Sequence, residues 1–198
     1  MSARALAAPL VRILAASAIA GTLAVPSAVA AAARHGRDLV GPAATGGLRA
    51  FAIGDSVMLD AQPYLARDGI AVDAAVSRQF FQGLDILRGL RATGRLPRRV
   101  VVGLGTNGPI TSALFDAMMG VLRGKRRVVF VTVREPRWWE GEVNSVLRAG
   151  VARWRPTARL ADWYALSWDE PGWFGDDGIH LTPAGAAAYA QLIAAAIR

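Results

Sequence analysis

Four side chains of the types that catalyse acyl transfer lie in three separate segments of the chain. Ser56 lies in "AIGDSVML" and Asn107 lies in "GLGTNG". His180 ends the segment "DDGIH", and Asp177 precedes it by three residues. A histidine is the usual base for a serine nucleophile, and a carboxylate holds the imidazole in its working tautomer. An asparagine amide is a typical donor to a developing oxyanion.

Each of these residues also has a purely structural interpretation. Asp55 or Ser56 fits the cap of a helix that begins there. The Asp-Asp-Gly segment fits an ordinary turn that carries a surface histidine. Asp176 replaces Asp177 as the carboxylate if the register of that turn differs by one residue.

Alternating apolar and amphipathic segments predict how these residues are positioned. We expect strands at residues 48–54, 70–76, 100–105, 128–133 and 158–162, and helices at residues 56–69, 81–94, 111–124, 139–154 and 182–197. Continuous apolar strands separated by helices indicate a parallel sheet covered on both faces, a three-layer α/β/α sandwich. The residues between the fifth strand and the last helix show no period and are expected to be irregular.

This arrangement makes the separate segments meet. In a parallel sheet, sites form at the carboxyl ends of the strands. Ser56 follows the first strand, Asn107 follows the third, and His180 precedes the last helix. Because all three segments are predicted at one edge of the sheet, we favour catalysis over caps and turns.

The glycines Gly103, Gly105 and Gly108 form a G-x-G-x-x-G pattern, which also occurs in dinucleotide-binding proteins. That fingerprint belongs after the first strand, with an acidic residue about 20 positions further on. Here the pattern follows the third strand, and basic residues lie at that offset. We therefore expect no nucleotide cofactor. We also expect no metal site, because the domain has one histidine among scattered acids and the chain contains no cysteine.

The ends and charge of the chain suggest where it works. Residues 1–30 have a basic start, an apolar segment and a small-x-small site, which predict a signal peptide or an N-terminal anchor. Residues 31–47 resemble a linker, and residues 48–198 form the domain.

A net charge of +8 favours an anionic cell-envelope surface as a partner. Nucleic acid is not expected, because the charges form no stripe interleaved with aromatic residues. The arginine-rich segments 95–99 and 123–127 are expected at the end of the sheet opposite the site. They form either a solvated face or a face that docks on an anionic wall polymer.

Other polar and aromatic residues follow the strands. Arg78 and Gln79 could contact a sugar or an acyl carbonyl, or they could brace their loop. Trp138 and Trp173 could stack on a sugar ring, although packing is the commoner role of tryptophan.

The segments "AIGDSVML", "GLGTNG" and "DDGIHLTPAG" resemble the motifs of the SGNH, or GDSL-like, hydrolase superfamily, over the chain from about Phe51 onward. The segments "VDAAVSRQ", "GTNG" and "REPRWWEGEVN" are similar to the extracytoplasmic SGNH domain of peptidoglycan and polysaccharide O-acetyltransferases. The resemblance implies a flavodoxin-like sheet of order 2-1-3-4-5.

The resemblance also implies roles for individual residues. Ser56 would be the nucleophile, His180 the base and Asp177 the residue that orients it. The oxyanion hole would consist of the backbone N–H groups of Ser56 and Ser77 and the side chain of Asn107. Ser77 departs from the family pattern, which usually has glycine at that position.

These implications predict a secreted serine esterase that acts through an acyl-Ser56 intermediate on O-acylated carbohydrate, with O-acetylated cell-wall glycan as the favoured substrate, or on a small ester. Two alternatives remain: an O-acetyltransferase with the same triad, and a non-catalytic glycan-binding module. The O-acetyltransferases carry a multi-pass membrane domain that supplies acetyl groups. We find no such segment here, so transfer would require a membrane acyl-donor protein as a partner.

Overall fold

The computed structural model describes residues 50–125 and 127–198. The expected signal peptide and linker lie outside these residues. Five strands form the sheet: β1 (Ala50–Gly54), β2 (Ile70–Ala74), β3 (Arg99–Gly103), β4 (Arg127–Val131) and β5 (Ala158–Ala161). The helices are α2 (Ser56–Arg67), α3 (Phe80–Ala92), α4 (Ser112–Val121), α5 (Glu140–Arg153), α6 (Trp163–Leu166) and α7 (Pro183–Ile197), with a 3₁₀ turn η1 at Pro171–Trp173.

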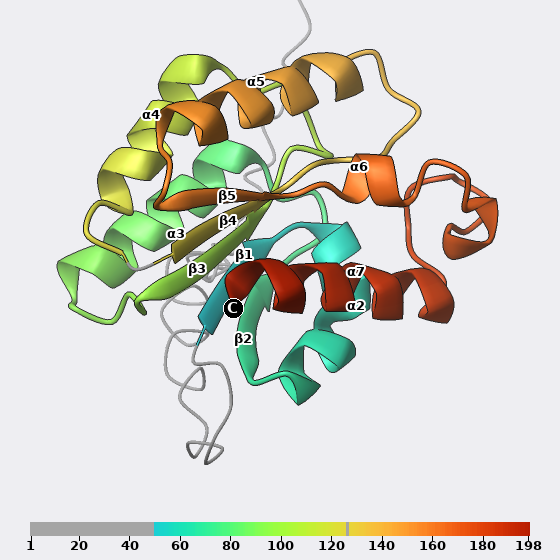
Figure 1. Cartoon of the computed structure of the whole chain (residues 1–198), viewed down its shortest axis with the longest axis horizontal. Coiled ribbons are helices and arrows are strands. Elements are labelled where there is room, and N and C mark those ends of the chain that lie inside the picture. The colour runs from blue at the N-terminus through green and yellow to red at the C-terminus, as the bar shows by residue number, and fades with distance from the viewer. Residues whose placement is uncertain (1–49, 126) are drawn as a thin grey trace, which may run out of the picture. The chain divides into compact units, whose positions relative to one another are not determined.

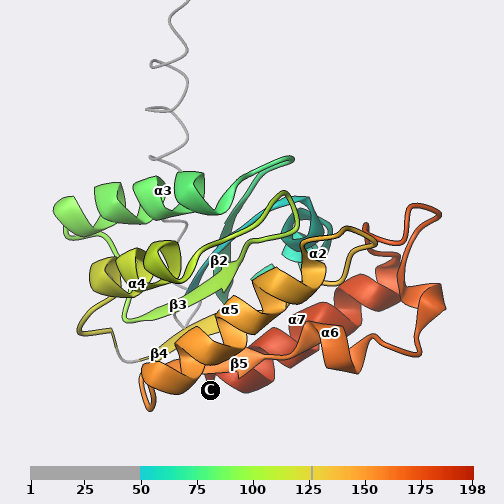
Figure 2. The same ribbon diagram turned by 90° about the horizontal axis from the view of Figure 1, so that it is seen from above.

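All pairings in the sheet are parallel, and the strand order is β2-β1-β3-β4-β5. Helices α2 and α7 pack together on one face, while α3, α4 and α5 cover the other (Figures 1 and 2). The predicted three-layer α/β/α fold and its strand order are therefore confirmed.

The apolar strands explain why both faces of the sheet are covered. Val100, Val101 and Val102 of β3 are at most 1% exposed, and β4 is equally buried from Val128 to Val131. Because side chains of a strand alternate between the two faces, a continuous apolar strand needs a helix layer on each side.

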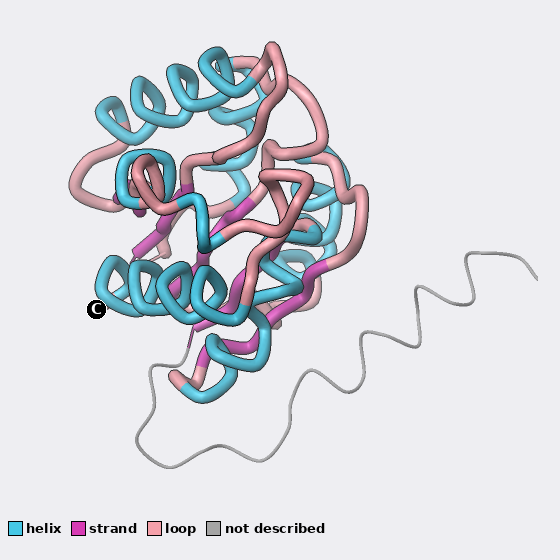
Figure 3. The backbone as a smooth tube through the Cα atoms, turned by 90° about the vertical axis from the view of Figure 1, so that its right-hand side faces the viewer, coloured by secondary structure: helices cyan, strands magenta, loops and turns pink. Residues whose placement is uncertain are grey.

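Two of the helices that start at the carboxyl edge, α2 and α7, begin directly after a residue whose side chain caps them. Asp55 accepts a hydrogen bond from the Val57 N–H at 3.1 Å and caps α2. Thr182 caps α7 in the same way through the N–H of Gly185. Such caps satisfy amide groups that have no partner within the helix. They fix where each helix leaves the edge of the sheet, in the loops that face the viewer in Figure 3.

The stretch after β5 is more ordered than the sequence analysis predicts. It contains α6 and η1, and Trp163 of α6 is 1% exposed. Trp173 stacks on Trp163 with ring centroids 5.5 Å apart. The short elements lack a detectable period, and they form because their aromatic rings pack under the start of α7.

None of the helices in the described part of the chain is long and apolar enough to span a membrane.

Candidate active site

Ser56 is the first residue of α2, directly after β1. It is 7% exposed, and the preceding Asp55 is 1% exposed. The turn is tied to the sheet because the Asp55 N–H donates to the Gly103 carbonyl at 3.2 Å. A side chain at Gly54 would collide with Met58, since a Cβ there would lie 2.3 Å from the Met58 Cβ. These contacts set the serine at the start of a helix, where the positive end of the helix dipole favours developing negative charge.

The neighbouring strands bring two further loops beside this turn. β1 lies between β2 and β3, and Gly54 is paired with both Ala74 and Gly103. Gln79 donates from Nε2 to the Asn107 carbonyl at 2.5 Å, and Asn107 donates from Nδ2 to the Arg78 carbonyl at 3.4 Å. The loops after β2 and β3 are therefore cross-linked in both directions.

Ser77, in the loop after β2, has a φ of +58°. This left-handed region is unfavourable for most residues and natural for glycine. The geometry explains why glycine is usual at this position in the family that the sequence resembles. Serine meets the same backbone requirement at a cost of about 1 kcal/mol.

Three N–H donors at this edge remain available for a ligand. The cap on α2 uses the Val57 N–H, but within residues 50–125 and 127–198 the N–H groups of Ser56 and Ser77 have no hydrogen-bond acceptor. The Asn107 amide has a second N–H beyond the one that it donates to Arg78. This set matches the oxyanion hole that the sequence analysis predicts, and its role stays a prediction.

Asp177 and His180 form a close pair in the loop between η1 and α7. The His180 Nδ1 lies 2.5 Å from the Asp177 Oδ2, while the Asp177 Oδ1 accepts the N–H groups of Ile179 and His180 at 2.9 and 3.0 Å. Because Nδ1 faces the carboxylate, Nε2 is the ring nitrogen left for a substrate or a nucleophile. Asp177 makes these contacts, whereas no hydrogen bond or ion pair of Asp176 is found in the described part of the chain.

The contact between Asp177 and His180 shifts the pKa values of both side chains so that each favours its charged form. The hydrogen bond with His180, followed by the two backbone N–H groups, lowers the pKa of Asp177 to about 2. The hydrogen bond with Asp177 raises the pKa of His180, partly opposed by burial. The charges of Asp177, Asp60 and Asp55 raise it further. A raised pKa makes His180 a stronger proton acceptor.

The His180 loop is joined to the helix that carries Ser56. The Leu181 N–H donates to the Asp60 Oδ2 at 2.9 Å, across 121 positions in the sequence. The charge of Asp55, the residue before Ser56, also acts on His180. The structure therefore brings the segments of Ser56, Ser77, Asn107, Asp177 and His180 to one edge of the sheet.

The glycine pattern after β3 serves packing and turning. A Cβ at Gly103 would lie 2.6 Å from the Met58 Cε and 2.7 Å from the Tyr189 Oη. Gly105 has a φ of +134°, and a Cβ there would lie 2.8 Å from Val143. The glycines let α2, α5 and α7 approach the end of β3.

The weaker candidates for substrate contact have different environments. Arg78 pairs with Asp73 at 2.7 Å and donates to the Gly54 carbonyl, so its guanidinium braces the loop after β2. Gln79 is engaged by Asn107. Trp138 is 75% exposed, whereas Trp173 packs against the core.

The sequence analysis missed Glu135, which lies in the loop after β4. It is 3% exposed, and neither of its carboxylate oxygens has a hydrogen-bond partner in the described residues. Burial raises its pKa to about 8, and the charges of Asp55 and Glu140 act in the same direction. The indole of the nearby Trp139 donates to the Thr106 carbonyl at 3.3 Å, beside Asn107. The segment "REPRWW" placed Glu135 at a strand end, but its burial depends on the fold.

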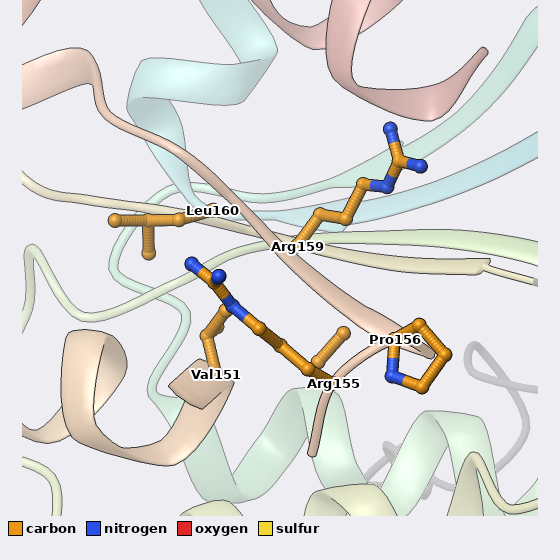
Figure 4. Close-up of a pocket in the computed structure, with 6 residues that line it drawn as sticks. Val151, Arg155, Pro156, Arg159 and Leu160 are labelled. Atoms are coloured by element: carbon orange, nitrogen blue, oxygen red, sulfur yellow. The ribbon is translucent and has the colours of Figure 1, made fainter. Parts of the chain in front are cut away.

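A separate pocket of about 390 Å³ lies at the other end of the sheet, where α5 ends and β5 begins. Val151, Leu160 and the side chains of Arg155 and Arg159 line it (Figure 4). The two guanidinium groups point in different directions, so they do not form a single anion site. In the described residues no group of three His, Cys, Asp or Glu side chains is placed to hold a metal ion.

Two relatives share the domain. The chain is 36% identical over 144 residues to peptidoglycan O-acetyltransferase OatA of Listeria monocytogenes. The match covers 72% of this chain and 23% of that protein. It is 33% identical over 150 residues to the putative peptidoglycan O-acetyltransferase YrhL of Bacillus subtilis, with 75% and 23% covered. The chain thus spans about a quarter of the length of these curated relatives.

Solved structures agree with the sequence relatives, although no family model matches the chain. The C-terminal catalytic domain of Streptococcus pneumoniae peptidoglycan O-acetyltransferase A, which carries a methylsulfonyl adduct, is 26% identical with a TM-score of 0.67. That match covers 74% of this chain and 90% of the other. A GDSL-like lipase from Bacteroides thetaiotaomicron, at 16% identity, shares the fold with a TM-score of 0.60 over 75% of this chain and 86% of the other.

The strand order, the position of Ser56 after β1 and these relatives agree with one another. The chain therefore belongs to the SGNH (GDSL-like) hydrolase superfamily, as an SGNH-type enzyme similar to the catalytic domain of peptidoglycan O-acetyltransferases.

Proposed function

We propose that this domain transfers acetyl groups on peptidoglycan through an acetyl-Ser56 intermediate. The observation that carries the proposal is the hydrogen bond between Leu181 and Asp60, because it attaches the Asp177–His180 pair to the helix that begins at Ser56. The O-acetyltransferase relatives support the same chemistry.

The first half-reaction loads the serine. The His180 Nε2 takes the proton from the Ser56 Oγ as this oxygen bonds to the acetyl carbonyl carbon of an ester donor. The tetrahedral intermediate then collapses, the bond from carbon to the leaving oxygen breaks, and Nε2 returns the proton to that oxygen. Asp177 keeps the ring oriented and stabilises the imidazolium.

Three free N–H donors at this edge would stabilise the oxyanion by hydrogen bonds. The N–H groups of Ser56 and Ser77 and the amide of Asn107 would bind the carbonyl oxygen as its charge develops. The cross-links of Gln79 and Asn107 hold these donors before substrate arrives. Preorganised donors of this kind contribute about 3 kcal/mol each to the barrier reduction.

The second half-reaction depends on the acceptor. The acceptor oxygen gives its proton to the His180 Nε2 and bonds to the acetyl carbon; the bond from that carbon to the Ser56 Oγ then breaks, and Nε2 returns the proton to Oγ. A sugar hydroxyl as acceptor yields an O-acetylated glycan, and water yields acetate. The side chains of His180 and Asp177 are 50% and 48% exposed, which leaves water access to the acyl-enzyme. For this reason we also propose esterase activity, the reaction expected from the sequence, on O-acetylated glycan or a small ester.

The aromatic surface after β4 and β5 offers sugar contacts. Trp138 is exposed and forms an edge-to-face pair with Trp139 at 5.4 Å. Arg134 lies 4.8 Å from the ring centre of Trp168. Exposed tryptophan rings suit the apolar faces of sugars. We assign Trp138 to glycan binding, whereas Trp173 serves packing.

The acetyl donor and the location belong to the same proposal. We infer that a membrane protein or domain supplies the acetyl group, and that the site works outside the cytoplasm, where peptidoglycan lies.

A basic pocket supports attraction to the anionic envelope. Arg91, Arg123 and Lys125 line a space of about 280 Å³ at the amino ends of the strands. Burial and then the charges of Arg91 and Arg98 lower the pKa of Lys125. The domain should bind vesicles that contain anionic lipids and should not bind neutral vesicles. Each of these cations replaced by glutamine should weaken the binding by about 1 kcal/mol. An Arg88→Gln control should bind as the wild type does.

Turnover of 4-nitrophenyl acetate tests the acyl-enzyme. Ser56→Ala should lose at least about 10³-fold in kcat/KM. Ser112→Ala is a matched control, because Ser112 is also the first residue of a helix after a capping residue, Thr111. Equal rates for wild type and Ser56→Ala, together with no labelling by a fluorophosphonate, would favour a non-catalytic glycan-binding module.

A second assay separates transfer from hydrolysis. The domain is incubated with an acetyl donor and a chitooligosaccharide, and the products are resolved by mass spectrometry. Acetylated sugar that depends on Ser56 supports the transferase. Free acetate alone supports the esterase.

A further inference from the structure

The loop that carries His180 is bonded mainly to itself. The Gly175 N–H donates to the His180 carbonyl at 2.8 Å, and the Gly178 N–H donates to the Gly175 carbonyl at 2.9 Å. Asp177 accepts two further N–H groups of the same loop. Such bonds shape the loop, but they do not determine its position relative to the nucleophile.

One hydrogen bond determines that position. Among the described residues, the bond from the Leu181 N–H to the Asp60 Oδ2 is the only one that joins residues 174–182 to an element other than η1 and α7. Leu181 follows His180 directly. A loss of this bond would leave the histidine attached only through its own loop and the packing of Leu181 and Ile179 against the core.

The position of Asp60 along α2 matters as much as the bond. Asp60 lies four residues after Ser56, and residues four apart in a helix lie on the same face. The carboxylate that holds the His180 loop is therefore one helical turn from the hydroxyl that His180 must deprotonate. A rigid helix fixes this separation.

Asp60 also carries charge. The acidic groups that act on His180 are Asp177 from its own loop, Asp60 from α2 and Asp55 from the turn before α2. No lysine or arginine forms an ion pair with Asp60 in the described ranges. When His180 takes the serine proton it becomes an imidazolium, and a nearby carboxylate stabilises this cation.

We propose that Asp60 is a positioning residue that holds His180 over Ser56 through the Leu181 N–H and stabilises the imidazolium by its charge. The inference rests on the acyl-Ser56 chemistry proposed above. It adds Asp60 to the proposed triad of Ser56, Asp177 and His180. Asp60 contacts neither the substrate nor the reacting atoms, so its influence passes through His180.

Two substitutions separate the bond from the charge. Asp60→Asn keeps an oxygen that accepts the Leu181 N–H and removes the charge, whereas Asp60→Ala removes both. Asp60→Ala should lower kcat by about 10- to 100-fold with KM for 4-nitrophenyl acetate nearly unchanged, because a misplaced base costs rate and not binding. Asp60→Asn should recover most of the kcat that Asp60→Ala loses.

The pH profile distinguishes this role from a merely structural one. In Asp60→Asn the acid limb of kcat/KM should move to lower pH, since one of the charges that raise the His180 pKa is gone. Asp68→Asn, at the end of the same helix, serves as the control and should leave the rate and the profile unchanged. Thermal unfolding of each variant shows whether it is folded.

Three results would overturn the inference. They are an Asp60→Ala rate equal to that of Asp68→Asn, an unshifted acid limb in Asp60→Asn, and no rescue by asparagine relative to alanine. If Ser56→Ala is as active as the wild type, the acyl-enzyme proposal fails separately. The His180 titration followed by NMR then still reports whether the Asp60 charge acts on the ring.

Discussion

The two halves of the candidate site are built on different supports. Ser56 and Asn107 lie in turns that adjoin the strands β1 and β3, and Asp55 beside the serine is 1% exposed. His180 lies in a loop held mainly by its own hydrogen bonds, with a side chain that is 50% exposed. The turn that carries Ser56, the proposed nucleophile, therefore shares the stability of the core, whereas His180, the proposed base, depends on a few local contacts. Mutations in the two halves should therefore have different consequences.

The largest expected effect is a loss of activity in the exposed half. Asp177→Asn should lower kcat/KM by about 10²- to 10⁴-fold, because the imidazole loses its orienting carboxylate. The free energy of unfolding should change by about 1 kcal/mol or less, as for other exposed pairs. Ester turnover and urea denaturation measure the two quantities. A large loss of stability would show that the loop is part of the core after all.

The opposite outcome is expected in the buried half. Gly103→Ala should destabilise the domain by about 1–3 kcal/mol, because a Cβ would press on Met58 and Tyr189. Gly120→Ala is the matched control: Gly120 lies in α4 with open space around it, so alanine there should stabilise by about 0.5–1 kcal/mol. Equal midpoints of denaturation for the two variants would contradict the tight packing at β3.

Glu135 gives the buried half a pH dependence of stability. Its pKa is raised from 4.5 to about 8, so the folded protein retains a proton that the unfolded chain releases. Stability should therefore fall as the pH rises from about 4.5 to 8. Glu135→Gln should gain about 2–5 kcal/mol at pH 8.5, where the upper value corresponds to the full pKa shift, and little at pH 4.5. Denaturation at both values, with Asp85→Asn as an exposed control, provides the measurement, and a gain that is independent of pH would refute the explanation.

His180, the proposed base, provides a titration. Because the hydrogen bond with Asp177 raises the pKa of His180, acidification should remove activity at a pH above the ordinary histidine value of 6.5. In Asp177→Asn the pKa should fall, and the imidazole should remain neutral to lower pH. A His35→Gln background leaves His180 as the only histidine, so its NMR titration is unambiguous. An identical pKa in both proteins would contradict the pairing.

The smallest effect concerns Ser77, the strained residue in the loop after β2. Ser77→Gly should retain activity and change stability by less than about 1 kcal/mol, since relief at a φ of +58° is offset by the greater freedom of the unfolded chain. Ser77→Val should be clearly less stable, because a β-branched side chain does not suit this backbone region. Differential scanning calorimetry of both variants tests the order, and equal stabilities would contradict the left-handed conformation.

The fold class, the strand order through the family resemblance, and the sheet edge of the candidate site could all be predicted from the amino-acid sequence. These follow from hydrophobic period, chain order and the rule that parallel strands end together, all of which are local or topological. The assignment of Ser56, Asp177, His180 and Asn107 used residue types and spacing, and their catalytic roles stay predictions.

The remaining features of the candidate site could not be predicted, because they depend on contacts that exist only after folding. The burial of Glu135, the stacking of Trp173 on Trp163 and the bond from Asp60 to Leu181 join residues that are distant in sequence or depend on neighbouring side chains. No period or motif encodes such contacts. They arise when separate elements pack against one another and exclude water, so a polar group finds its partner, or lacks one, only in the folded domain.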